Sequence, residues 1–418
     1  MKLLIKQAKI ISPSSPFHGQ TKDILIASGK ISKIDSSITE KADKTIEHDG
    51  LCVSIGWMDI FADFADPGFE QKEDIGSGAK AAAAGGFTDV MLIPNSSPVT
   101  DNKSQVEYIV QKAKQEAVNI HPIGSVTKKA EGKELSEMYD MQQSGAIAFS
   151  DGINSIQNSG LVLKALQYVK SFNGTVIQLP DDKGVGANGL MNEGIISTQM
   201  GLPGKPNMAE ELMVARDIKL ARYADSKLHF TGVSSPKSLE YIKRAKEGGI
   251  AVSCSITPYQ VYFCDEDLQG YDTNLKLNPP LRNRTDMMAI RQALLDGAID
   301  CIASHHLPQH WDNKTCEFEY AKSGMISLET MFAVLTSSGL AAEDFVQMQT
   351  VNVRNIFGIP VPELKEGEAA ILTLFAPDAE FVFEESMIHS KSKNSPFIGR
   401  SLKGKVIGII NKSNTQLN

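Results

Sequence analysis

The chain is predicted to be an α/β protein built around a parallel (β/α)8 barrel. Short apolar runs alternate with amphipathic segments over roughly 300 residues, which is typical of a parallel sheet covered by helices. Eight such strand and helix units are enough to close a barrel. The two ends of the chain are instead rich in short strands. A total of 418 residues leaves room for a smaller module beside the barrel.

The strand-rich ends come first in this prediction. Strands are expected at residues 3–6, 8–11, 23–27 and 30–34, and near the other end at 370–375, 381–383 and 406–410. Ser/Pro and Ser-Gly turns separate the N-terminal strands. These N-terminal strands are too few and too short to form a stable domain alone.

The segment 52–68 predicts the first barrel strand. An apolar run from Cys52 to Ile60 enters an alternating pattern and stops at the turn Asp66-Pro67-Gly68. A helix at 76–86 and a strand at 88–95 follow. Further strands are expected at 120–124, 146–151, 175–179, 228–233, 250–254 and 299–304, with helices at 159–171, 210–224, 236–247 and 286–296.

The first barrel strand also predicts where the chemistry lies. Side chains alternate along a strand, so Asp59, Phe61 and Asp63 share one face. In a barrel of this kind the functional groups stand at the carboxyl ends of the strands. The end of the first strand is therefore the expected edge of the site.

Composition excludes several classes of protein. No apolar run approaches the roughly 20 residues that span a bilayer, so no membrane partner is expected. A formal net charge of −8 without a basic cluster argues against nucleic acid. The five cysteines are scattered and form no Cys-x-x-Cys pair, so we expect reduced thiols in a cytoplasmic protein.

Several motifs occur in an order that resembles the dihydroorotases of the cyclic amidohydrolase group. They are Ala82–Asp89, Pro94-Asn95, Met191–Gly194, Gly201–Pro206, Asn278–Arg282, Ser327–Thr330 and Asn352–Gly358. The resemblance implies a distorted barrel of the metal-dependent hydrolase type over residues 55–365. It also implies a small β-sandwich made from residues 1–54 together with 366–418, and a place in pyrimidine biosynthesis.

At the family's substrate and metal positions the agreement is uneven. The resemblance implies that Asn95, Asn278 and His306 contact substrate, whereas Ala65 stands where the family has a substrate-binding arginine. The remaining family positions are changed: Phe61 and Asp63 replace the two histidines of the first strand, Gln178 and Gly232 replace later histidines, and His305 replaces the general-base aspartate.

These replacements predict that the family's metal site does not form. A phenylalanine has no lone pair for a cation, and catalytic zinc takes about three protein ligands. One alternative is a rebuilt site in which Asp63, Asp151 and His305 converge on one zinc ion. His305 and His306 are adjacent on a strand end, so they should face opposite ways and not chelate together. His229 lies in an apolar strand and is interpreted as a core histidine.

Three hypotheses follow. The first is a catalytically inactive dihydroorotase-like protein without a metal cofactor, acting as a structural or regulatory partner of aspartate carbamoyltransferase, the partner that the resemblance implies. The second is an active cyclic amidohydrolase that uses the rebuilt zinc site, with His305 or Asp63 moving the proton. The third is a module that binds a cyclic ureide without turnover. A homo-oligomer is expected in each case.

Overall fold

The parallel sheet predicted for the centre of the chain is confirmed. The computed structural model describes residues 2–418. Its barrel strands are, in spatial order, β6 (Trp57–Ala62), β7 (Phe87–Leu92), β8 (Asn119–Gly124), β9 (Ala148–Phe149), β10 (Thr175–Gln178), β13 (Lys227–Phe230), β14 (Val252–Ile256) and β15 (Cys301–Ile302). A parallel bridge between Ala62 and His306 then brings the segment after β15 back to β6 and closes the ring. The amide of Asp63 donates to the carbonyl of His306 at 2.8 Å on this seam.

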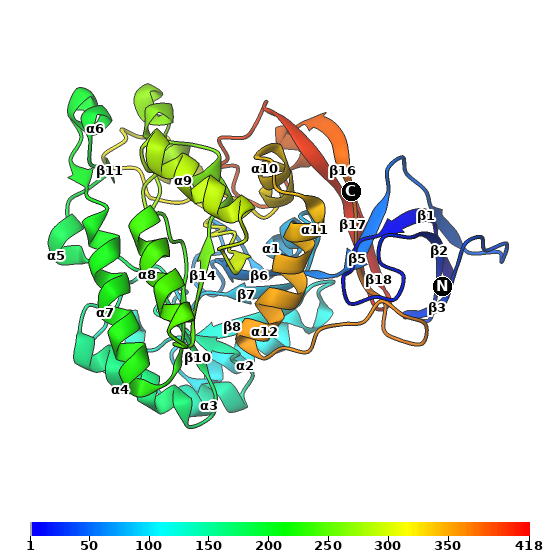
Figure 1. Cartoon of the computed structure of the whole chain (residues 1–418), viewed down its shortest axis with the longest axis horizontal. Coiled ribbons are helices and arrows are strands. Elements are labelled where there is room, and N and C mark those ends of the chain that lie inside the picture. The colour runs from blue at the N-terminus through cyan, green and yellow to red at the C-terminus, as the bar shows by residue number, and fades with distance from the viewer. Residues whose placement is uncertain (1) are drawn as a thin grey trace.

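Helices surround the barrel, as Figure 1 shows. They are α1 (Ile75–Ala84), α2 (Lys103–Lys112), α3 (Met138–Gln143), α4 (Ser159–Lys170), α7 (Met208–Ala224), α8 (Pro236–Glu247), α9 (Arg284–Leu295), α10 (Met331–Ser337), α11 (Ala342–Gln347) and α12 (Val353–Phe357). All five predicted helices form, with small shifts at their ends. Polar residues cap several of them, such as Asn158 before α4 and Asn283 before α9.

The alanine run of α1 has a packing role. Ala81, Ala82 and Ala83 are fully buried, and a side chain at Gly78 would come within 2.4 Å of the Phe64 ring. Small residues on this helix let it approach the sheet closely. The prediction of a helix packed closely on the sheet is therefore confirmed.

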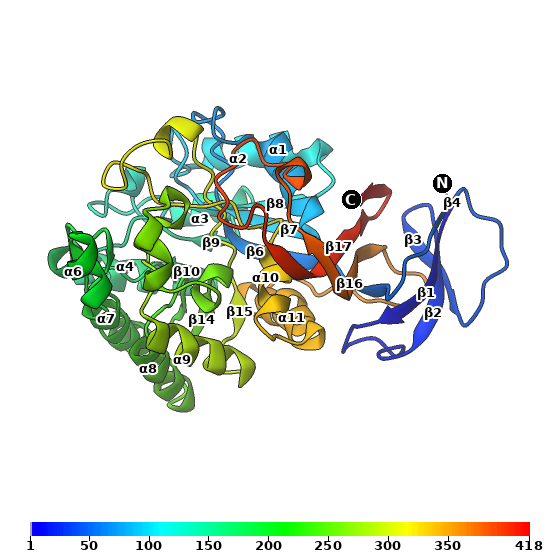
Figure 2. The ribbon, with the colours of Figure 1, turned by 90° about the horizontal axis from the view of Figure 1, so that it is seen from above.

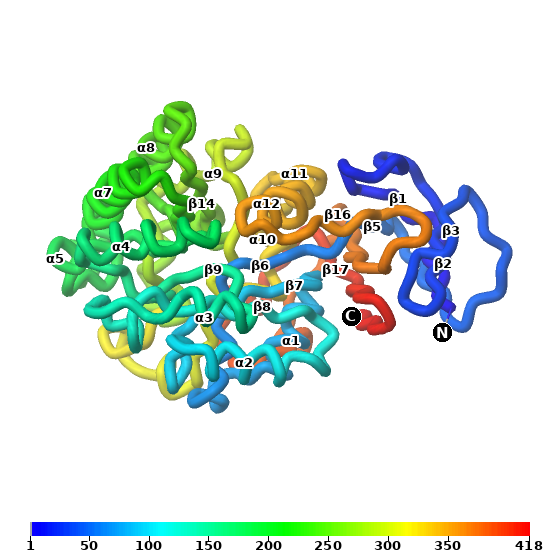
Figure 3. The backbone as a smooth tube through the Cα atoms, turned by 90° about the horizontal axis from the view of Figure 1, so that it is seen from below, coloured from blue at the N-terminus to red at the C-terminus, as the bar shows by residue number. Residues whose placement is uncertain are grey.

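The two ends of the chain join in one eight-stranded sheet. Its strands are β1 (Lys2–Ile10), β2 (Thr21–Ala27), β3 (Lys30–Asp35), β4 (Lys44–Ile46), β5 (Cys52–Ile55), β16 (Ile371–Val382), β17 (Ser401–Asn411) and β18 (Asn414–Leu417). The order is β18-β17-β16-β5-β1-β2-β3, with β4 on β1. Antiparallel pairing of β5 with β16 joins the N-terminal segment to the C-terminal one. Figures 2 and 3 show this sheet at one side of the barrel, with both termini on it.

Three strand assignments differ from the prediction. The apolar run 52–60 is predicted to form one barrel strand, but it forms β5, which belongs to the terminal sheet, and most of β6, which belongs to the barrel. The runs 3–6 and 8–11 belong to the single strand β1, whose register shifts between Ile5 and Ala8, where Gln7 has a φ of 48°. The runs 370–375 and 381–383 likewise lie in the single strand β16, which also contains a register shift. A bulge interrupts the alternating pattern without ending the strand.

Aromatic residues join the terminal sheet to the barrel. Trp57 at the start of β6 is fully buried, and its ring centroid lies 5.0 Å from Phe332, 4.8 Å from Phe345 and 5.1 Å from Phe375. These rings come from the barrel and from β16 alike. Buried aromatic clusters contribute strongly to an interface, so the two parts form one continuous packed structure.

An excursion of small elements follows β10. It contains α5 (Lys183–Gly186), β11 (Met191–Asn192), α6 (Ile195–Met200) and β12 (Gly204–Lys205), and β11 pairs with β12 in parallel. Within residues 2–418, no helix combines the length and the apolar character that crossing a bilayer requires.

Candidate site at the barrel mouth

Phe61 and His305 lie against each other at the predicted centre of the site. Phe61 is on β6 and His305 follows β15, so barrel closure brings them together. Their ring centroids are 4.3 Å apart and their planes differ by 25°. Both side chains are buried, at 0% and 1% exposure. Burial lowers the pKa of His305 to about 3, so its imidazole is neutral at pH 7.

Two further residues close the space around His305. The Nε2 atom of His305 lies 2.8 Å from the hydroxyl oxygen of Thr231. Gly232 has a φ of +68°, and a Cβ atom there would stand 2.7 Å from Cε1 of His305. The imidazole of His305 therefore occupies the space that a side chain at position 232 would need. Gln178, at the end of β10, is buried, and its amide donates to the carbonyl of Ile156 at 3.4 Å.

The carboxylates offered for a rebuilt metal site make other contacts. Asp151 accepts hydrogen bonds from the Ser125 hydroxyl at 3.0 Å, from the Thr127 amide at 2.8 Å and from the Thr127 hydroxyl at 2.5 Å. Asp63 accepts the amide of Ala65 at 2.7 Å. Burial raises the pKa of both carboxyls.

A zinc ion at this mouth would need several ligand side chains close together. Within residues 2–418, no three His, Cys, Asp or Glu side chains gather closely enough to hold a metal ion. Catalytic zinc needs about three protein ligands and one open position. Asp63, Asp151 and His305 are thus not brought together, and the residues at this mouth do not fit a catalytic zinc.

Asn95 is engaged with the backbone of the loop after β9. Its amide nitrogen donates to the carbonyl of Asp151 at 3.1 Å, and its amide oxygen accepts the N–H of Ile153 at 3.1 Å. A side chain at Gly152 would overlap the Asn95 oxygen at 1.7 Å. Both ends of the Asn95 side chain therefore satisfy loop backbone.

Asn278 belongs to a polar cluster at the mouth. Its oxygen accepts from the ammonium of Lys205 at 2.9 Å, and its nitrogen donates to Asp181 at 3.3 Å. Lys205 also pairs with both carboxylate oxygens of Asp181, at 3.0 and 2.9 Å. These two ionic residues were not singled out from the sequence, although Lys205 lies in the motif Gly201–Pro206.

His306 has different partners from His305. It is fully buried; its Nδ1 accepts the N–H of Ser327 at 3.2 Å, and its Nε2 lies 3.6 Å from a carboxylate oxygen of Glu73. Burial alone would raise the pKa of Glu73, but the nearby imidazole of His306 and hydrogen bonds from Ser390 and Ser77 lower it below its usual value. Glu73 was missed because a lone glutamate between a turn and a helix carries no sequence signal.

His229 is confirmed as a core histidine. It is fully buried on β13, and its two ring nitrogens lie 2.8 Å from the Ser253 hydroxyl and 3.0 Å from the Ser255 hydroxyl. Burial lowers its pKa to about 3. Both polar atoms are thus satisfied within the sheet.

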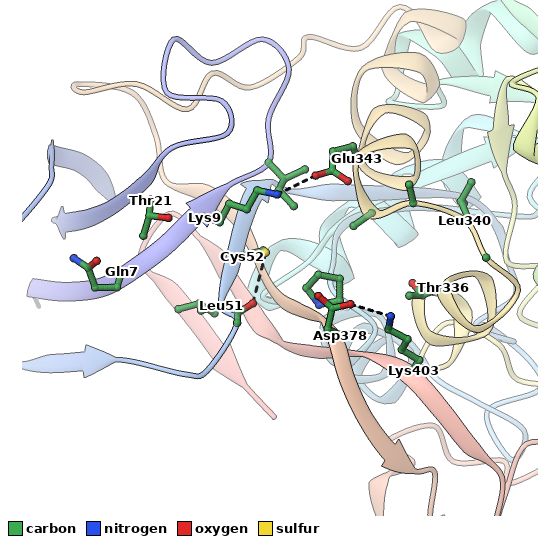
Figure 4. Close-up of a pocket in the computed structure, with 16 residues that line it drawn as sticks. Gln7, Lys9, Thr21, Leu51, Cys52, Thr336, Leu340, Glu343, Asp378 and Lys403 are labelled. Carbon is green, nitrogen blue, oxygen red and sulfur yellow. Dashed lines mark hydrogen bonds and ion pairs between the residues drawn. The ribbon is translucent and has the colours of Figure 1, made fainter.

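Two cavities differ in their distance from the residues described above: one is beside the barrel mouth and the other is at the terminal sheet. One, of about 250 Å3, lies beside the mouth; Asn278 and Lys205 line it together with Ile153, Lys276 and Leu307. Another, of about 570 Å3, lies between the terminal sheet and helices α10 and α11. Figure 4 shows its ion pairs, Lys9 with Glu343 at 3.3 Å and Lys403 with Asp378 at 2.9 Å. Phe61 and His305 line neither cavity.

Known proteins match this chain along almost its whole length. A family model described as Dihydro-orotase-like matches residues 51–238. A protein of Geobacter metallireducens named dihydroorotase is 42% identical over 410 residues, covering 97% of this chain and 96% of the relative. A protein of Syntrophus aciditrophicus with the same name is 40% identical over 414 residues, covering 97% of each.

Solved structures share the fold. An L-hydantoinase (dihydropyrimidinase) from Arthrobacter aurescens has a TM-score of 0.85 at 21% identity, covering 99% of this chain and 95% of that one. A dihydropyrimidinase from Brevibacillus agri has a TM-score of 0.82 at 20% identity, covering 100% and 95%. At these identities the likeness concerns the barrel and the flanking sheet alone.

Proposed function

Since the chain belongs to the dihydroorotase family, we propose that it is a member that does not hydrolyse a cyclic amide. Instead it serves as a structural or regulatory partner of aspartate carbamoyltransferase. The observation that carries the first part is the stack of Phe61 on His305, 4.3 Å between centroids, at two of the family's functional positions. The second part is supported by the resemblance described above.

Hydrolysis of a cyclic amide in this family needs a metal ion, so the residues at the metal positions decide whether it can occur. Bulk water has a pKa of about 15.7, and a bound metal ion lowers it enough to generate hydroxide at neutral pH. Here three positions at which the resemblance implies metal ligands carry an apolar ring, a glycine and an amide, namely Phe61, Gly232 and Gln178. A fourth carries Asp63, and the carboxyls of Asp63 and Asp151 accept hydrogen bonds from the protein itself. These residues therefore do not provide the ligands for a metal ion that would generate hydroxide.

His305 is also poorly placed as a general base. A base must lie within hydrogen-bond reach of the proton that it removes. The Nε2 atom of His305 contacts Thr231, one face of its ring is covered by Phe61, and only 1% of the residue is exposed. Substrate would have to displace the Phe61 ring to reach it.

The first test measures metal and turnover together. The purified chain is analysed for zinc by mass spectrometry and assayed for ring opening of dihydroorotate, with and without added zinc. The Geobacter metallireducens relative serves as the reference in the same assay. We expect less than stoichiometric zinc and no turnover. Stoichiometric zinc with turnover that His305→Ala abolishes would establish the rebuilt active site instead.

The partner is tested by direct association. The chain and the aspartate carbamoyltransferase of the same cell are mixed and analysed by size-exclusion chromatography with light scattering. We expect co-elution at a mass above that of either protein. Separate elution at micromolar concentrations would remove the partner hypothesis while leaving the inactivity of the barrel intact. Calorimetry with dihydroorotate, expected to give no heat, tests the remaining ureide-binding hypothesis.

A further inference from the structure

A cavity of about 510 Å3 lies near the barrel mouth but outside the family's site. Segments far apart in the chain contribute to it: the loop after β6, the 3-10 turn at 273–275, the loop after β15, and the stretch between β16 and β17. The residues that line it include Lys314, Lys391, Lys393 and Trp311. Cavities of this size hold small metabolites.

The charges of the lining are one-sided. Three lysines line the cavity, and none of the described residues that line it is an aspartate or glutamate. Lys391 pairs with Asp74 and donates to the carbonyl of Glu70 at 2.9 Å. Lys393 donates to the carbonyls of Ile388 at 2.7 Å and Ser390 at 3.1 Å. The carboxylate of Asp74 compensates the charge of Lys391, whereas Lys393 is held by carbonyl groups alone and keeps an uncompensated charge.

Lys314 is the buried member of the three. It is 8% exposed, and its ammonium donates to the carbonyl of Thr273 at 2.8 Å, while the Thr273 hydroxyl donates back to the carbonyl of Lys314 at 2.6 Å. Burial lowers the pKa of Lys314 to about 7. An ammonium group carries three donors, so two remain for a ligand. A buried cation without a bonded carboxylate is stabilised by an anion placed beside it.

The other residues that line the cavity include neutral hydrogen-bond donors and one exposed aromatic ring. Thr315, Ser392 and Asn274 carry hydroxyl and amide groups that hydrogen-bond phosphate oxygens well. Trp311 is 65% exposed, although a tryptophan loses more than most residues by facing water. An exposed indole beside a cationic cavity is suited to stack on a planar ring.

We propose that this cavity binds a phosphate-bearing ligand with a planar ring, of the nucleoside monophosphate class. The phosphate lies between Lys314 and the two anchored lysines, and the ring stacks on Trp311. A dianion matches the two lysines that have no carboxylate partner, Lys314 and Lys393, better than a singly charged group does. The site is independent of hydrolysis at the barrel mouth, and it requires no metal.

Calorimetry of the full chain tests the proposal with four probes. They are uridine 5′-monophosphate, adenosine 5′-monophosphate, uridine and ribose 5-phosphate. We expect saturable binding of both nucleotides, binding at least about tenfold weaker for ribose 5-phosphate, because stacking is lost, and none for uridine, because the phosphate contacts are lost. Equal affinity for uridine and its monophosphate, or no saturable heat with either nucleotide at millimolar concentration, would overturn the proposal.

Variants then locate the site. Lys314→Met removes the buried charge and keeps the volume, and it should weaken nucleotide binding by about tenfold or more. Trp311→Ala alters an exposed residue, so it tests the site even if the buried substitution prevents folding. It should bring nucleotide affinity down to that of ribose 5-phosphate. Lys41→Gln, at an exposed lysine of the terminal module, is the matched control. Unchanged nucleotide binding in both Lys314→Met and Trp311→Ala would contradict this location.

Discussion

The phenyl ring of Phe61 lies almost parallel to the imidazole of His305, with 4.3 Å between their centroids. The two residues are far apart in the chain and meet only because the segment after β15 returns to β6. Neighbouring apolar residues, including Met58, Met91, Ile123 and Ile177, surround Phe61 in one buried cluster. The ring therefore packs as part of the barrel interior.

Phe61→Ala should lower the free energy of unfolding by about 3–5 kcal/mol, because it leaves a cavity that a closed barrel cannot collapse to fill. Denaturation in urea, followed by circular dichroism, measures this loss. Tyr223→Ala removes a similarly large ring that is 76% exposed, and it should have little effect. Equal losses in the two variants would show that Phe61 is not a packed core residue.

Gly232→Ala should be more destabilising than Gly249→Ala. Both glycines have a positive φ, +68° and +76°, and each alanine costs about 1–2 kcal/mol for that conformation. The methyl group at 232 also meets His305 at 2.7 Å, whereas no atom lies within 4 Å of the methyl position at 249. Overpacking should add about 1–3 kcal/mol. Adding His305→Ala to the Gly232→Ala background should reduce that extra loss, and a purely additive pair would contradict the contact.

Arg282→Met should lower the free energy of unfolding by about 3–5 kcal/mol, because it leaves Glu210 buried without its cation. Both side chains are 2% exposed and their charged groups are 3.1 Å apart. Arg284→Met, two residues further along, breaks an exposed pair with Glu266 and should change stability little. Thermal and urea unfolding of the two variants give the comparison. Similar stability of both would mean that the buried pair is dispensable.

The free energy of unfolding should fall in acid, partly because the Asp89 carboxylate becomes protonated. Burial alone would raise the pKa of this carboxyl, but contacts with His121 at 3.0 Å and Arg354 at 2.9 Å lower it to about 2. The folded pKa lies below the unfolded value of about 3.9, so this stabilisation is complete above pH 4 and is lost as pH falls toward 2. The shift corresponds to about 2–3 kcal/mol.

Asp89→Asn tests this pH dependence. The variant should be less stable near pH 6 and should lose stability less steeply between about pH 4 and pH 2, measured by urea unfolding at each pH. Asp49→Asn, at an exposed position, is the control for a general effect of charge. An acid dependence identical to that of the unchanged protein would exclude Asp89 as its source.

Much of the barrel could be predicted because its signals are local. The apolar run whose second half becomes β6 and the amphipathic segments that become α4 and α8 each carry their own periodicity. The different contacts of His305 and His306 do not follow from strand alternation, because His305 lies beyond β15 and has a φ of 45°. The single strands β1 and β16 could not be predicted as such, because a bulge disturbs the same pattern that marks a strand.

The contacts of the site depended on distant residues. Asn95 could be matched to a family motif, but its attachment to the backbone of Asp151 and Ile153 required the loops of two strands to be placed together. The same is true of Asn278, which Lys205 and Asp181 hold from another loop.

The sequence by itself determined that a phenylalanine stands where the resemblance implies a metal ligand, since the chemistry of a side chain does not depend on the fold. It also determined the succession of strands and helices, because each element depends on neighbours a few residues away. Only the tertiary structure decided that His305 fills the space beside Phe61, and that three lysines and Trp311 surround one cavity. Those relationships arise when barrel closure and the long C-terminal segment bring together residues that are remote in the chain.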